Sequence, residues 1–537
     1  MTVKIDSYRF KKRRTFAIIS HPDAGKTTLT ENFLLNGKII RVPGTIKSRG
    51  SGKYAKSDWM KIEKKRGISI TTSIIQIEYG KYLINLLDTP GHKDFSEDTY
   101  RVLTAVDFCV IVIDASKGIE EQTRKLIRIS RMRSIPILIF INKLDRNSRN
   151  PIELLDQLEF ELKVKCTPIV WPIGCGTSFK GIYHIYTDTV FFCLNKNFLS
   201  MYGLDCHSLK MKNINSSVLL NNILGLDIVR ELREDLELIN SVYVCFNVSL
   251  FLKSDLVPVY FGSALKNFGI DFLLKGILNW APSPTCKKSN IRYVHSNEKN
   301  FSGFIFKIQA NMDLKHRDRI AFLRIVSGQY KKNMKLYHVR IKKYILISDV
   351  FSFIAGDRFI LDEAYPGDII GFHSHKNIKI GDTFTEGEVL KFYDNISNFS
   401  PELFRRISLK NSLHKKKLLK GLLQLSEEGT IQVFKLLENN DFILGAIGKL
   451  QFDIVVERLR VEYNICVIIY SVQIFLVRWI SSKSLEKLSC FKAENKFYLA
   501  LDICDRLVYL ASSKINLKLV QSRYPDIIFS DICDISY

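Results

Sequence analysis

Short apolar runs alternate with longer amphipathic segments in the first part of the chain. The apolar runs occupy residues 16–19, 83–87, 108–113, 135–141 and 257–261. The segments between them have helical spacing and occupy residues 29–35, 96–106, 120–133 and 152–162. Because strands that alternate with helices form right-handed βαβ crossovers, this pattern predicts a mostly parallel sheet. The first domain is therefore predicted to be α/β, with its ligand at the carboxyl ends of the strands.

The alternation is interrupted between about residue 183 and residue 255. This stretch is aromatic, rich in Asn and poorly periodic, with one expected helix at 226–238. We interpret it as an insertion, since the strand pattern resumes directly after it. Pro282 and Pro284 then end a helical segment, so the first domain is expected to cover residues 1–281.

Two further domains are expected beyond residue 282. Short β-like runs at 301–309, 318–326, 335–339 and 344–348, with glycines between them, predict a small β-barrel over residues 282–395. Helical patterns at 415–425 and 448–463, with apolar strands between and after them, predict an α+β domain over residues 396–537.

A candidate binding site lies between the first strand and the first helix. It comprises Ser20, His21, Pro22, Asp23, Ala24, Gly25, Lys26, Thr27 and Thr28. A tight loop that ends in Gly-Lys-Thr directs backbone N–H groups and a helix N-terminus at one anionic point. The sequence therefore predicts a phosphate-binding loop (P-loop), although Ser20 stands where glycine is usual.

A second candidate follows the strand at 83–87. It comprises Asp88, Thr89, Pro90, Gly91 and His92. An aspartate at this strand end can hold magnesium through water, and the N–H of Gly91 can approach a γ-phosphate because glycine has no Cβ. The loop at 38–65 is rich in Gly, Ser, Lys and Arg, and we expect its order to depend on the γ-phosphate. Ser69, which follows this loop, has its hydroxyl in the right place to reach magnesium.

The remaining motifs predict that the base is guanine. Asn142, Lys143, Leu144 and Asp145 follow one apolar strand, and Ser263 and Ala264 follow another. An asparagine can meet the O6/N7 edge of guanine, and an aspartate carboxylate can accept from both N1–H and the N2 amino group. Adenine does not present that pair of donors. Four motifs in this order, each at the end of a strand, predict a GTP-binding domain.

The composition restricts the possible folds and functions only slightly. The chain has 537 residues, 46% of them hydrophobic and 25% charged, which fits several globular domains. Eleven cysteines are scattered without a C-x-x-C pair, so neither a disulfide framework nor a zinc site is indicated. The N-terminus lacks the apolar segment of a signal peptide, and no run has the length of a membrane span. The formal charge of +24 fits a nucleic-acid partner and, equally, a lysine-rich solvated surface.

Together these motifs resemble the class-II peptide chain release factors of bacteria, a family of ribosome-dependent translational GTPases. The resemblance extends beyond the motifs above to the segments 14–16, 57–60, 66–69, 306–312, 316–319, 404–406, 425–429 and 523–526. Members of this family also have serine at the first position of the P-loop. The resemblance is weakest in the insertion, in the Lys-rich linker and at the extreme C-terminus.

The resemblance implies a role for each matching residue. Lys26 would neutralise the β- and γ-phosphates. Thr27 and Ser69 would hold Mg²⁺ directly, and Asp88 would hold it through water. His92 would be the catalytic residue that positions the attacking water.

Further roles concern the γ-phosphate and the base. Gly91 would sense the γ-phosphate, and Lys143 would pack its stem on the base. The residues expected to read guanine are Asn142, Asp145, Ser263 and Ala264.

The same resemblance implies ligands and partners. It implies GTP/GDP and Mg²⁺ as ligands, the ribosome and class-I release factors as partners, and a cytoplasmic monomer that uses neither DNA nor a membrane. The expected activity is ribosome-stimulated hydrolysis of GTP to GDP and phosphate, which releases and recycles class-I release factors after peptide release. Two alternatives remain: a translocase like the elongation factors, and a non-ribosomal GTP-gated binding module in which the basic charge is incidental.

Overall fold

The computed structural model describes most of the chain. The described residues are 9–40, 63, 68–194, 208–210, 218–310, 319–354, 357–374, 377–392, 400–409, 414–439, 441–482 and 484–530. Most of the loop expected at 38–65, the segment 57–60 and parts of the insertion lie outside these residues.

The first domain, which the sequence predicts to bind GTP and which is called the G domain below, is built on one seven-stranded sheet with the order β2-β3-β1-β4-β5-β11-β6. Its strands are β1 (Arg13–Ser20), β2 (Ser73–Tyr79), β3 (Tyr82–Asp88), β4 (Phe108–Asp114), β5 (Ile137–Asn142), β6 (Lys165–Pro168) and β11 (Leu256–Phe261). All neighbours are parallel except β2 and β3, which form an antiparallel hairpin. The predicted α/β class with a mostly parallel sheet is confirmed.

Helices cover this sheet. They are α2 (Lys26–Asn36), α4 (Ser96–Ala105), α5 (Glu121–Met132), α6 (Pro151–Leu162) and α11 (Ile270–Trp280). Helix α2 packs against α11, and α5 packs against α6. The central strand β4 is buried along its whole length, as a parallel strand covered on both faces must be.

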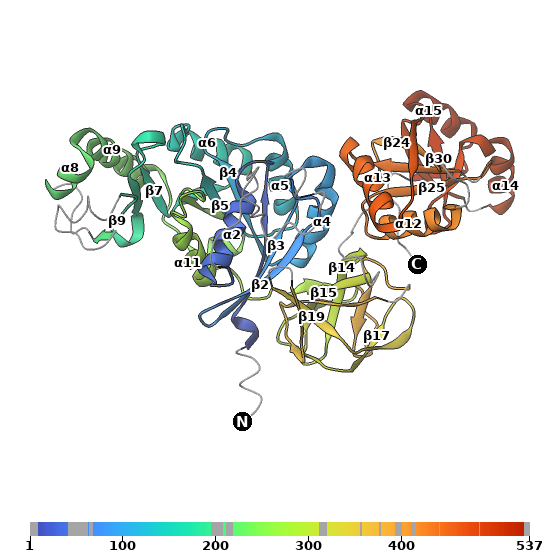
Figure 1. Cartoon of the computed structure of the whole chain (residues 1–537), viewed down its shortest axis with the longest axis horizontal. Helices are drawn as coiled ribbons and strands as arrows, with labels where there is room; N and C mark the ends of the chain where they lie inside the picture. The colour runs from blue at the N-terminus through green and yellow to red at the C-terminus, as the bar shows by residue number, and fades with distance from the viewer. Residues whose placement is uncertain are drawn as a thin grey trace.

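A four-stranded antiparallel sheet and three helices extend the G domain at one end of the molecule (Figure 1). The elements are β7 (Val170–Ile173), η2 (Gly176–Ser178), β8 (Gly181–His184), η3 (Ile185–Thr187), β9 (Thr189–Phe192), β10 (Ser208–Lys210), α8 (Val218–Leu224), α9 (Leu226–Val242) and α10 (Val248–Leu252). The indole N–H of Trp171 donates to Asp235 of α9 at 3.0 Å. This sheet starts before the change in sequence pattern near residue 183, because an apolar strand such as β7 does not reveal which sheet it joins.

A barrel-like antiparallel sheet follows, with the order β18-β17-β23-β14-β15-β22-β19-β20. The strands are β14 (Ser302–Ala310), β15 (Arg319–Ser327), β17 (Met334–His338), β18 (Lys343–Ile347), β19 (Val350–Ile354), β20 (Asp357–Ile360), β22 (Ile369–His373) and β23 (Thr383–Thr385). Two small pairs accompany it: β12 (Lys287–Lys288) with β13 (Tyr293–Val294), and β16 (Tyr330–Lys331) with β21 (Glu363–Ala364). The barrel has its own core around Ile305, Leu323 and Phe384.

The C-terminal domain contains a second eight-stranded sheet, ordered β27-β24-β26-β25-β29-β30-β28-β31. Its strands are β24 (Leu403–Leu409), β25 (Gln432–Leu436), β26 (Phe442–Ala446), β27 (Val467–Ser471), β28 (Leu476–Ser482), β29 (Leu499–Leu501), β30 (Leu507–Ala511) and β31 (Ile527–Ser530). Its helices are α12 (Lys415–Glu427), α13 (Lys449–Tyr463), α14 (Leu485–Glu494), η6 (Lys496–Tyr498) and α15 (Lys514–Arg523). Separate apolar clusters lie under α12 and α13 and under α14 and α15.

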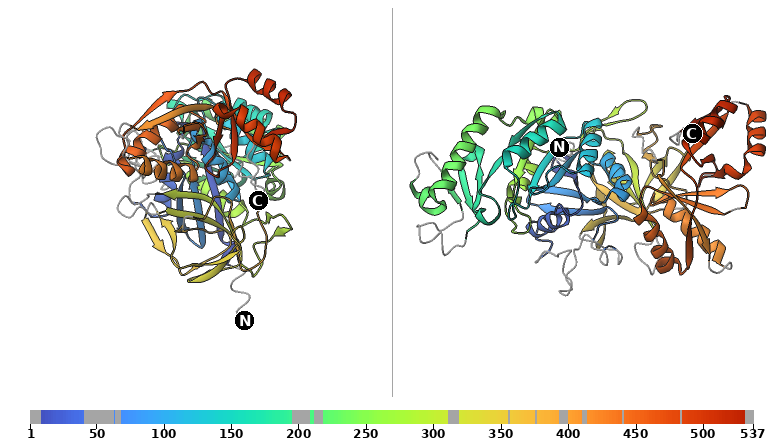
Figure 2. Two further views of the ribbon diagram at one scale, coloured as in Figure 1. Left: turned by 90° about the vertical axis from the view of Figure 1, so that its right-hand side faces the viewer. Right: turned by 90° about the horizontal axis from the view of Figure 1, so that it is seen from above.

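The C-terminal domain and the antiparallel sheet of β7–β10 lie at opposite ends of an elongated molecule (Figure 1), and the right-hand view of Figure 2 shows this separation from above. Among the helices in the described ranges, none is both long and apolar enough to cross a bilayer.

The barrel packs firmly on the G domain. Phe304, Phe306 and Phe322 of the barrel belong to the same apolar cluster as the core of the G domain. At the centre of this interface, the guanidinium of Arg324 lies 2.6 Å from the carboxylate of Asp107, and both side chains are almost fully buried. Apolar burial with a paired buried charge ties these two domains together.

One carbonyl adds to this interface. The carbonyl oxygen of Gly367 accepts hydrogen bonds from Thr15 at 2.6 Å, from Asn85 at 3.2 Å and from Arg324. Thr15 and Asn85 belong to β1 and β3, the two strands that lead into the predicted phosphate site. The barrel therefore contacts the strands that carry this site.

We predict that Arg324→Ala destabilises the chain strongly. Within the described part of the chain, removing the guanidinium leaves the buried Asp107 carboxylate with the hydrogen bonds from Thr285 alone. The free energy of unfolding should fall by about 3–5 kcal/mol, measured by urea denaturation of the whole chain. Lys332→Ala breaks an exposed pair with Asp362 and is the matched control, which should change stability by less than about 1 kcal/mol. Equal effects of the two substitutions would contradict the assigned role of the buried pair.

Candidate nucleotide site and its switches

The segment predicted to be the P-loop lies between β1 and α2. Gly25 has a φ of 98° and precedes the first residue of α2. A Cβ at this position would lie 2.2 Å from Nδ2 of Asn142, so both the backbone and the space require glycine. The Ser20 hydroxyl donates to the carbonyl of His21 at 2.9 Å, which uses the serine within the loop itself.

Lys26 and Asp88 meet at the carboxyl edge of the sheet. The Lys26 ammonium contacts the Asp88 carboxylate, and both side chains are almost completely buried. Thr27, the next residue of α2, is buried beside them. A hydroxyl and a carboxylate are hard oxygen donors of the kind that Mg²⁺ prefers, so this donor set fits that ion.

The turn after β3 lies directly against the P-loop. The Thr89 hydroxyl donates to the carbonyl of Ile18 at 2.8 Å, and the carbonyl of Pro90 accepts from Thr99 at 3.3 Å. A Cβ on Gly91 would approach the backbone of Ser20 and Pro22 to 3.3 Å. The glycine thus allows two backbone segments to lie in contact beside the P-loop.

Asn142 joins the P-loop to the loop after β11. Its Nδ2 donates to the carbonyl of Ala24 at 2.9 Å, and its Oδ1 accepts from the backbone N–H of Ala264 at 2.8 Å. The side chain is only 2% exposed. In this structure Asn142 therefore holds two loops together, and the O6/N7 contact expected from the sequence stays a prediction.

Asp145 and Ser263 meet at the end of the site where the sequence predicts that the base binds. The Ser263 hydroxyl donates to Oδ1 of Asp145 at 2.5 Å. The hydrogen bond restrains the carboxylate from one side. Leu144 between Asn142 and Asp145 is fully buried, and its N–H donates to the carbonyl of Gly262 at 3.3 Å. Leu144 is thus a packing residue that fixes this turn.

The Lys143 side chain contacts both the P-loop and Asp114, an aspartate that no motif in the sequence indicated. Its ammonium donates to the carbonyl of Asp23 at 2.5 Å and to the carboxylate of Asp114 at 2.7 Å. Burial opposes ionisation of Asp114, but hydrogen bonds from Lys143 and Ser116 outweigh it and hold its pKa below the ordinary value. Asp114 ends a central strand, as Asp88 does, and that position is the signal that could have identified it.

Two further residues of the predicted site are His21 and Thr28. Nε2 of His21 lies 3.3 Å from the carboxylate of Glu120. Burial lowers the pKa of His21, and the Glu120 carboxylate opposes that shift only in part. The carbonyl of Thr28 accepts from Asn32, which also donates to the carbonyl of Ala264 at 2.8 Å.

His92 caps a short 3-10 helix, η1 (Lys93–Phe95). Its Nδ1 accepts the backbone N–H of Asp94 at 3.2 Å, and its side chain is 29% exposed. Because Nδ1 accepts, a neutral ring carries its proton on Nε2. Ser69 is half-buried ahead of β2, and its role toward magnesium stays a prediction.

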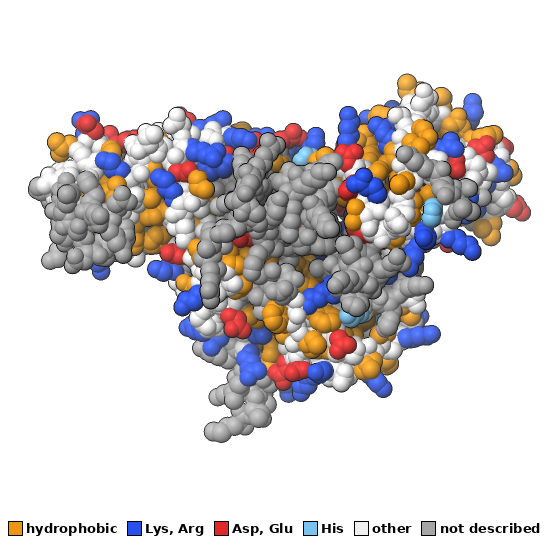
Figure 3. Space-filling view, viewed as in Figure 1, with side chains coloured by type: hydrophobic (Ala, Val, Ile, Leu, Met, Phe, Trp, Pro, Cys, Tyr) orange, Lys and Arg blue, Asp and Glu red, His pale blue; other side chains and the backbone are white. Residues whose placement is uncertain are grey.

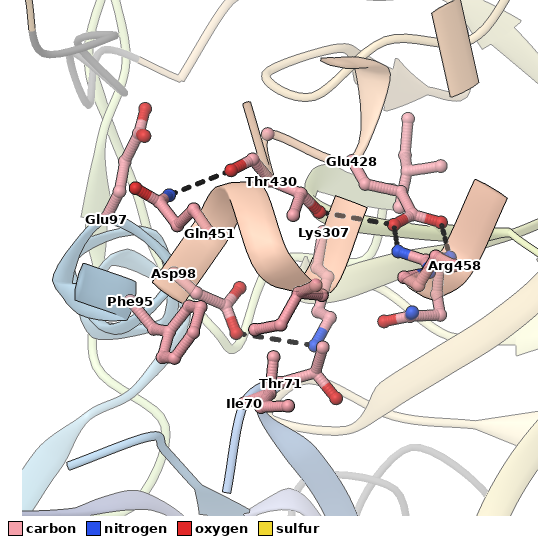
Figure 4. Close-up of a pocket in the computed structure, with 14 residues that line it drawn as sticks. Ile70, Thr71, Phe95, Glu97, Asp98, Lys307, Glu428, Thr430, Gln451 and Arg458 are labelled. Atoms are coloured by element: carbon pink, nitrogen blue, oxygen red, sulfur yellow. Dashed lines mark hydrogen bonds and ion pairs between the residues drawn. The ribbon is translucent and has the colours of Figure 1, made fainter. Parts of the chain in front are cut away.

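The segment after Ser69 and the segment after His92 both contact the barrel and the C-terminal domain (Figure 4). Lys307 of β14 donates to the carbonyl of Thr72 at 2.7 Å and lies 3.5 Å from the carboxylate of Asp98. Burial opposes ionisation of Asp98, but Lys307 and two hydrogen bonds from Thr72 hold its pKa below the ordinary value. The barrel therefore contacts the segment that follows Ser69.

Glu428 joins all three domains at the same junction. Its carboxylate accepts from the N–H of Ala310 in the barrel at 2.6 Å and from both terminal nitrogens of Arg458 in α13. Its backbone carbonyl accepts from Arg101 of α4 at 3.1 Å. A Cβ on Gly429 would collide with that guanidinium, so the turn after α12 fits closely around Arg101.

Three family models match the chain in succession. The elongation factor Tu GTP binding domain matches residues 11–283, domain 2 of elongation factor G matches residues 300–387, and the C-terminal domain of class II release factor RF3 matches residues 393–521. A solved structure from Thermus thermophilus has the same fold, with a TM-score of 0.68 at 19% identity, covering 88% of this chain and 71% of its own.

Sequence identity to curated relatives shows the family of this chain. A peptide chain release factor 3 from Buchnera aphidicola subsp. Baizongia pistaciae is 68% identical over 99% of this chain and 100% of its own. Another, from Buchnera aphidicola subsp. Acyrthosiphon pisum, is 60% identical over 97% of each chain. The chain belongs to the peptide chain release factor 3 family. As a member of that family it is a translational GTPase of termination, which confirms the predicted enzyme class and the use of GTP/GDP.

We predict that Asp145→Asn weakens GTP binding and shifts preference toward xanthosine triphosphate. Xanthine replaces the N2 donor of guanine with an acceptor, which an asparagine amide can contact. Loss of a charge-assisted bidentate contact should cost about 1.5–3 kcal/mol of GTP affinity, measured by nucleotide titration. Asp227→Asn, on the exposed first turn of α9, is the control and should leave both affinities unchanged. Unaltered GTP affinity of the Asp145 variant would refute the base assignment.

Proposed function

We propose that this chain is a ribosome-stimulated GTPase that removes class-I release factors from the ribosome after the peptide has been released. The observation that supports the proposal most strongly is the convergence of the predicted motifs on one edge of the G domain. Lys26 contacts Asp88 there, Asn142 joins the P-loop to the loop of Ala264, and Ser263 contacts Asp145.

The proposed roles follow from this placement. Lys26 neutralises the β- and γ-phosphates, and the N–H of Gly91 contacts the γ-phosphate. Thr27, Ser69 and, through water, Asp88 would hold Mg²⁺, which neutralises charge on the phosphate oxygens when bound. Asp145, with Ser263 and Ala264, reads the guanine base.

Hydrolysis in this proposal depends on His92. Phosphoryl transfer needs positioning and charge stabilisation more than covalent chemistry, so a histidine that orients water suits the reaction. The ring lies only partly exposed, on the turn that also carries Gly91. Binding to the ribosome then brings His92 into its productive position, so the free protein hydrolyses GTP slowly.

The proposed partners are the ribosome and the class-I release factors. Lys and Arg side chains are spread over all three domains on the face shown in Figure 3, which fits a broad contact with RNA better than a single basic groove. The protein acts as a monomer in the cytoplasm in this proposal. The bound nucleotide controls how the G domain sits against the other domains through the contacts of Lys307, Arg101 and Glu428.

We predict that His92→Ala removes most ribosome-stimulated turnover and leaves GTP affinity nearly unchanged. A group that acts only in the transition state lowers kcat without changing ground-state binding. Single-turnover hydrolysis on ribosomes and nucleotide titration of the free protein measure the two quantities. His295→Ala, at an exposed position in the linker before the barrel, is the matched control. A wild-type hydrolysis rate in the His92 variant would show that this histidine only shapes the turn.

The termination role predicts a second result. Addition of the protein with GTP to ribosomes that have already released their peptide should accelerate departure of a fluorescently labelled class-I release factor. A ligand shifts an equilibrium only by its differential affinity, so the GTP form must favour a ribosomal state that the class-I factor tolerates poorly. A non-hydrolysable GTP analogue should still permit that departure and should trap this protein on the ribosome. Unchanged departure together with faster transfer-RNA translocation would support the elongation-factor alternative.

A further inference from the structure

The N-cap position of α13 carries no side chain. Its N-cap residue is Gly448, and the Oε1 of Gln451 accepts the N–H groups of Ile447 and Gly448 at 2.7 and 3.1 Å. The N–H of Leu450 instead donates to Oδ2 of Asp94 in the G domain at 3.0 Å. The oxygen that a Ser, Thr or Asp N-cap would supply therefore comes from a different domain.

Gly448 is not required by its backbone conformation. Its φ of −141° and ψ of 164° lie in the extended region, which any residue adopts. A Cβ at this position would lie 1.8 Å from Cγ of Asp94. The Asp94 carboxylate thus occupies the space that an N-cap side chain would fill, and its negative charge is favourable at a helix N-terminus.

Asp94 also contacts His92. Its backbone N–H donates to Nδ1 of His92 at 3.2 Å, and its Oδ1 lies 3.4 Å from the same nitrogen. The Asp94 side chain is almost completely buried. Asp94 therefore contacts both the proposed catalytic histidine and the first turn of α13 in the C-terminal domain.

An apolar cluster strengthens the same contact. Phe95 of η1 and Ile70, which follows Ser69, pack with Ile454 of α13, and all three are buried (Figure 4). Leu450, the donor to Asp94, packs against this cluster. Both segments that are expected to respond to the γ-phosphate thus meet one face of α13.

We propose that Asp94 is a positioning residue for hydrolysis, which holds the turn of His92 ready for activation by the ribosome only while α13 is docked on the G domain. The C-terminal domain then controls the reaction through a helix cap: undocking of α13 releases the Asp94 carboxylate and, with it, the turn that carries His92. This inference rests on the proposed role of His92 and adds the element that controls it.

The test uses both sides of the contact. Asp94→Ala removes the cap, and Gly448→Ala leaves Asp94 in the sequence but pushes it away with the added Cβ. Each substitution should lower single-turnover hydrolysis on ribosomes by up to roughly tenfold, the factor expected when the full free energy of a lost cap falls on the docked arrangement that the reaction needs. GTP affinity of the free protein should not change. Asp94→Asn should retain most of the rate, because an amide oxygen can still accept from Leu450.

The double variant distinguishes this contact from general damage. In Asp94→Ala the three atoms nearest to a Gly448 Cβ are gone, so adding Gly448→Ala should cause little further loss of rate. Asp227→Ala is the control for removing an acidic residue from the first turn of a helix. Equal losses from Gly448→Ala in both backgrounds, or a fall in GTP affinity as large as the fall in rate, would overturn the proposal.

The outcome also separates this inference from the proposed function. Wild-type rates in Asp94→Ala and Gly448→Ala, with a slow His92→Ala, would overturn the role of Asp94 and leave the role of His92 intact. A wild-type rate in His92→Ala would reject the proposed catalysis itself, whatever the Asp94 variants do.

Discussion

The carboxamide of Asn142 is the contact on which the nucleotide site depends. It accepts from the loop of Ala264 and donates to the P-loop, so the two walls of the site are held at a fixed separation by one buried side chain. A Cβ on residue 25 would overlap the Asn142 amide, so this position requires glycine. This side chain therefore links three segments from distant parts of the chain: the P-loop, the turn that carries Asp145 and the loop after β11.

The two interfaces of the G domain differ in chemistry. The barrel shares the apolar core of the G domain and adds the buried pair of Arg324 and Asp107, so its separation would expose much apolar surface and an unpaired charge. The C-terminal domain contacts the G domain through a small apolar cluster and through hydrogen bonds of Asp94 and Arg101. Polar contacts can exchange with water, so this chemistry favours movement of the C-terminal domain over movement of the barrel.

Local patterns predicted much of the fold. The apolar runs became β1, β3, β4, β5 and β11, and Lys415–Glu427 and Lys449–Tyr463 are helices, because periodicity reports which face of a segment is buried. The order of the motifs also predicted that they share one edge of a parallel sheet. The start of the antiparallel sheet at β7 was less predictable, since a four-residue apolar strand fits either sheet.

By itself the sequence determined the classes of the three domains, the position of the loop between β1 and α2 and the family resemblance, because these depend on residue types at short spacings. Only the tertiary structure decided which groups meet. Asn142 acts between two loops, Lys143 reaches Asp114, and Asp94 caps a helix that lies more than 350 residues further along the chain. These pairings depend on the register of strands and the docking of domains, which arise from the packing of the whole chain and leave no periodic trace in it.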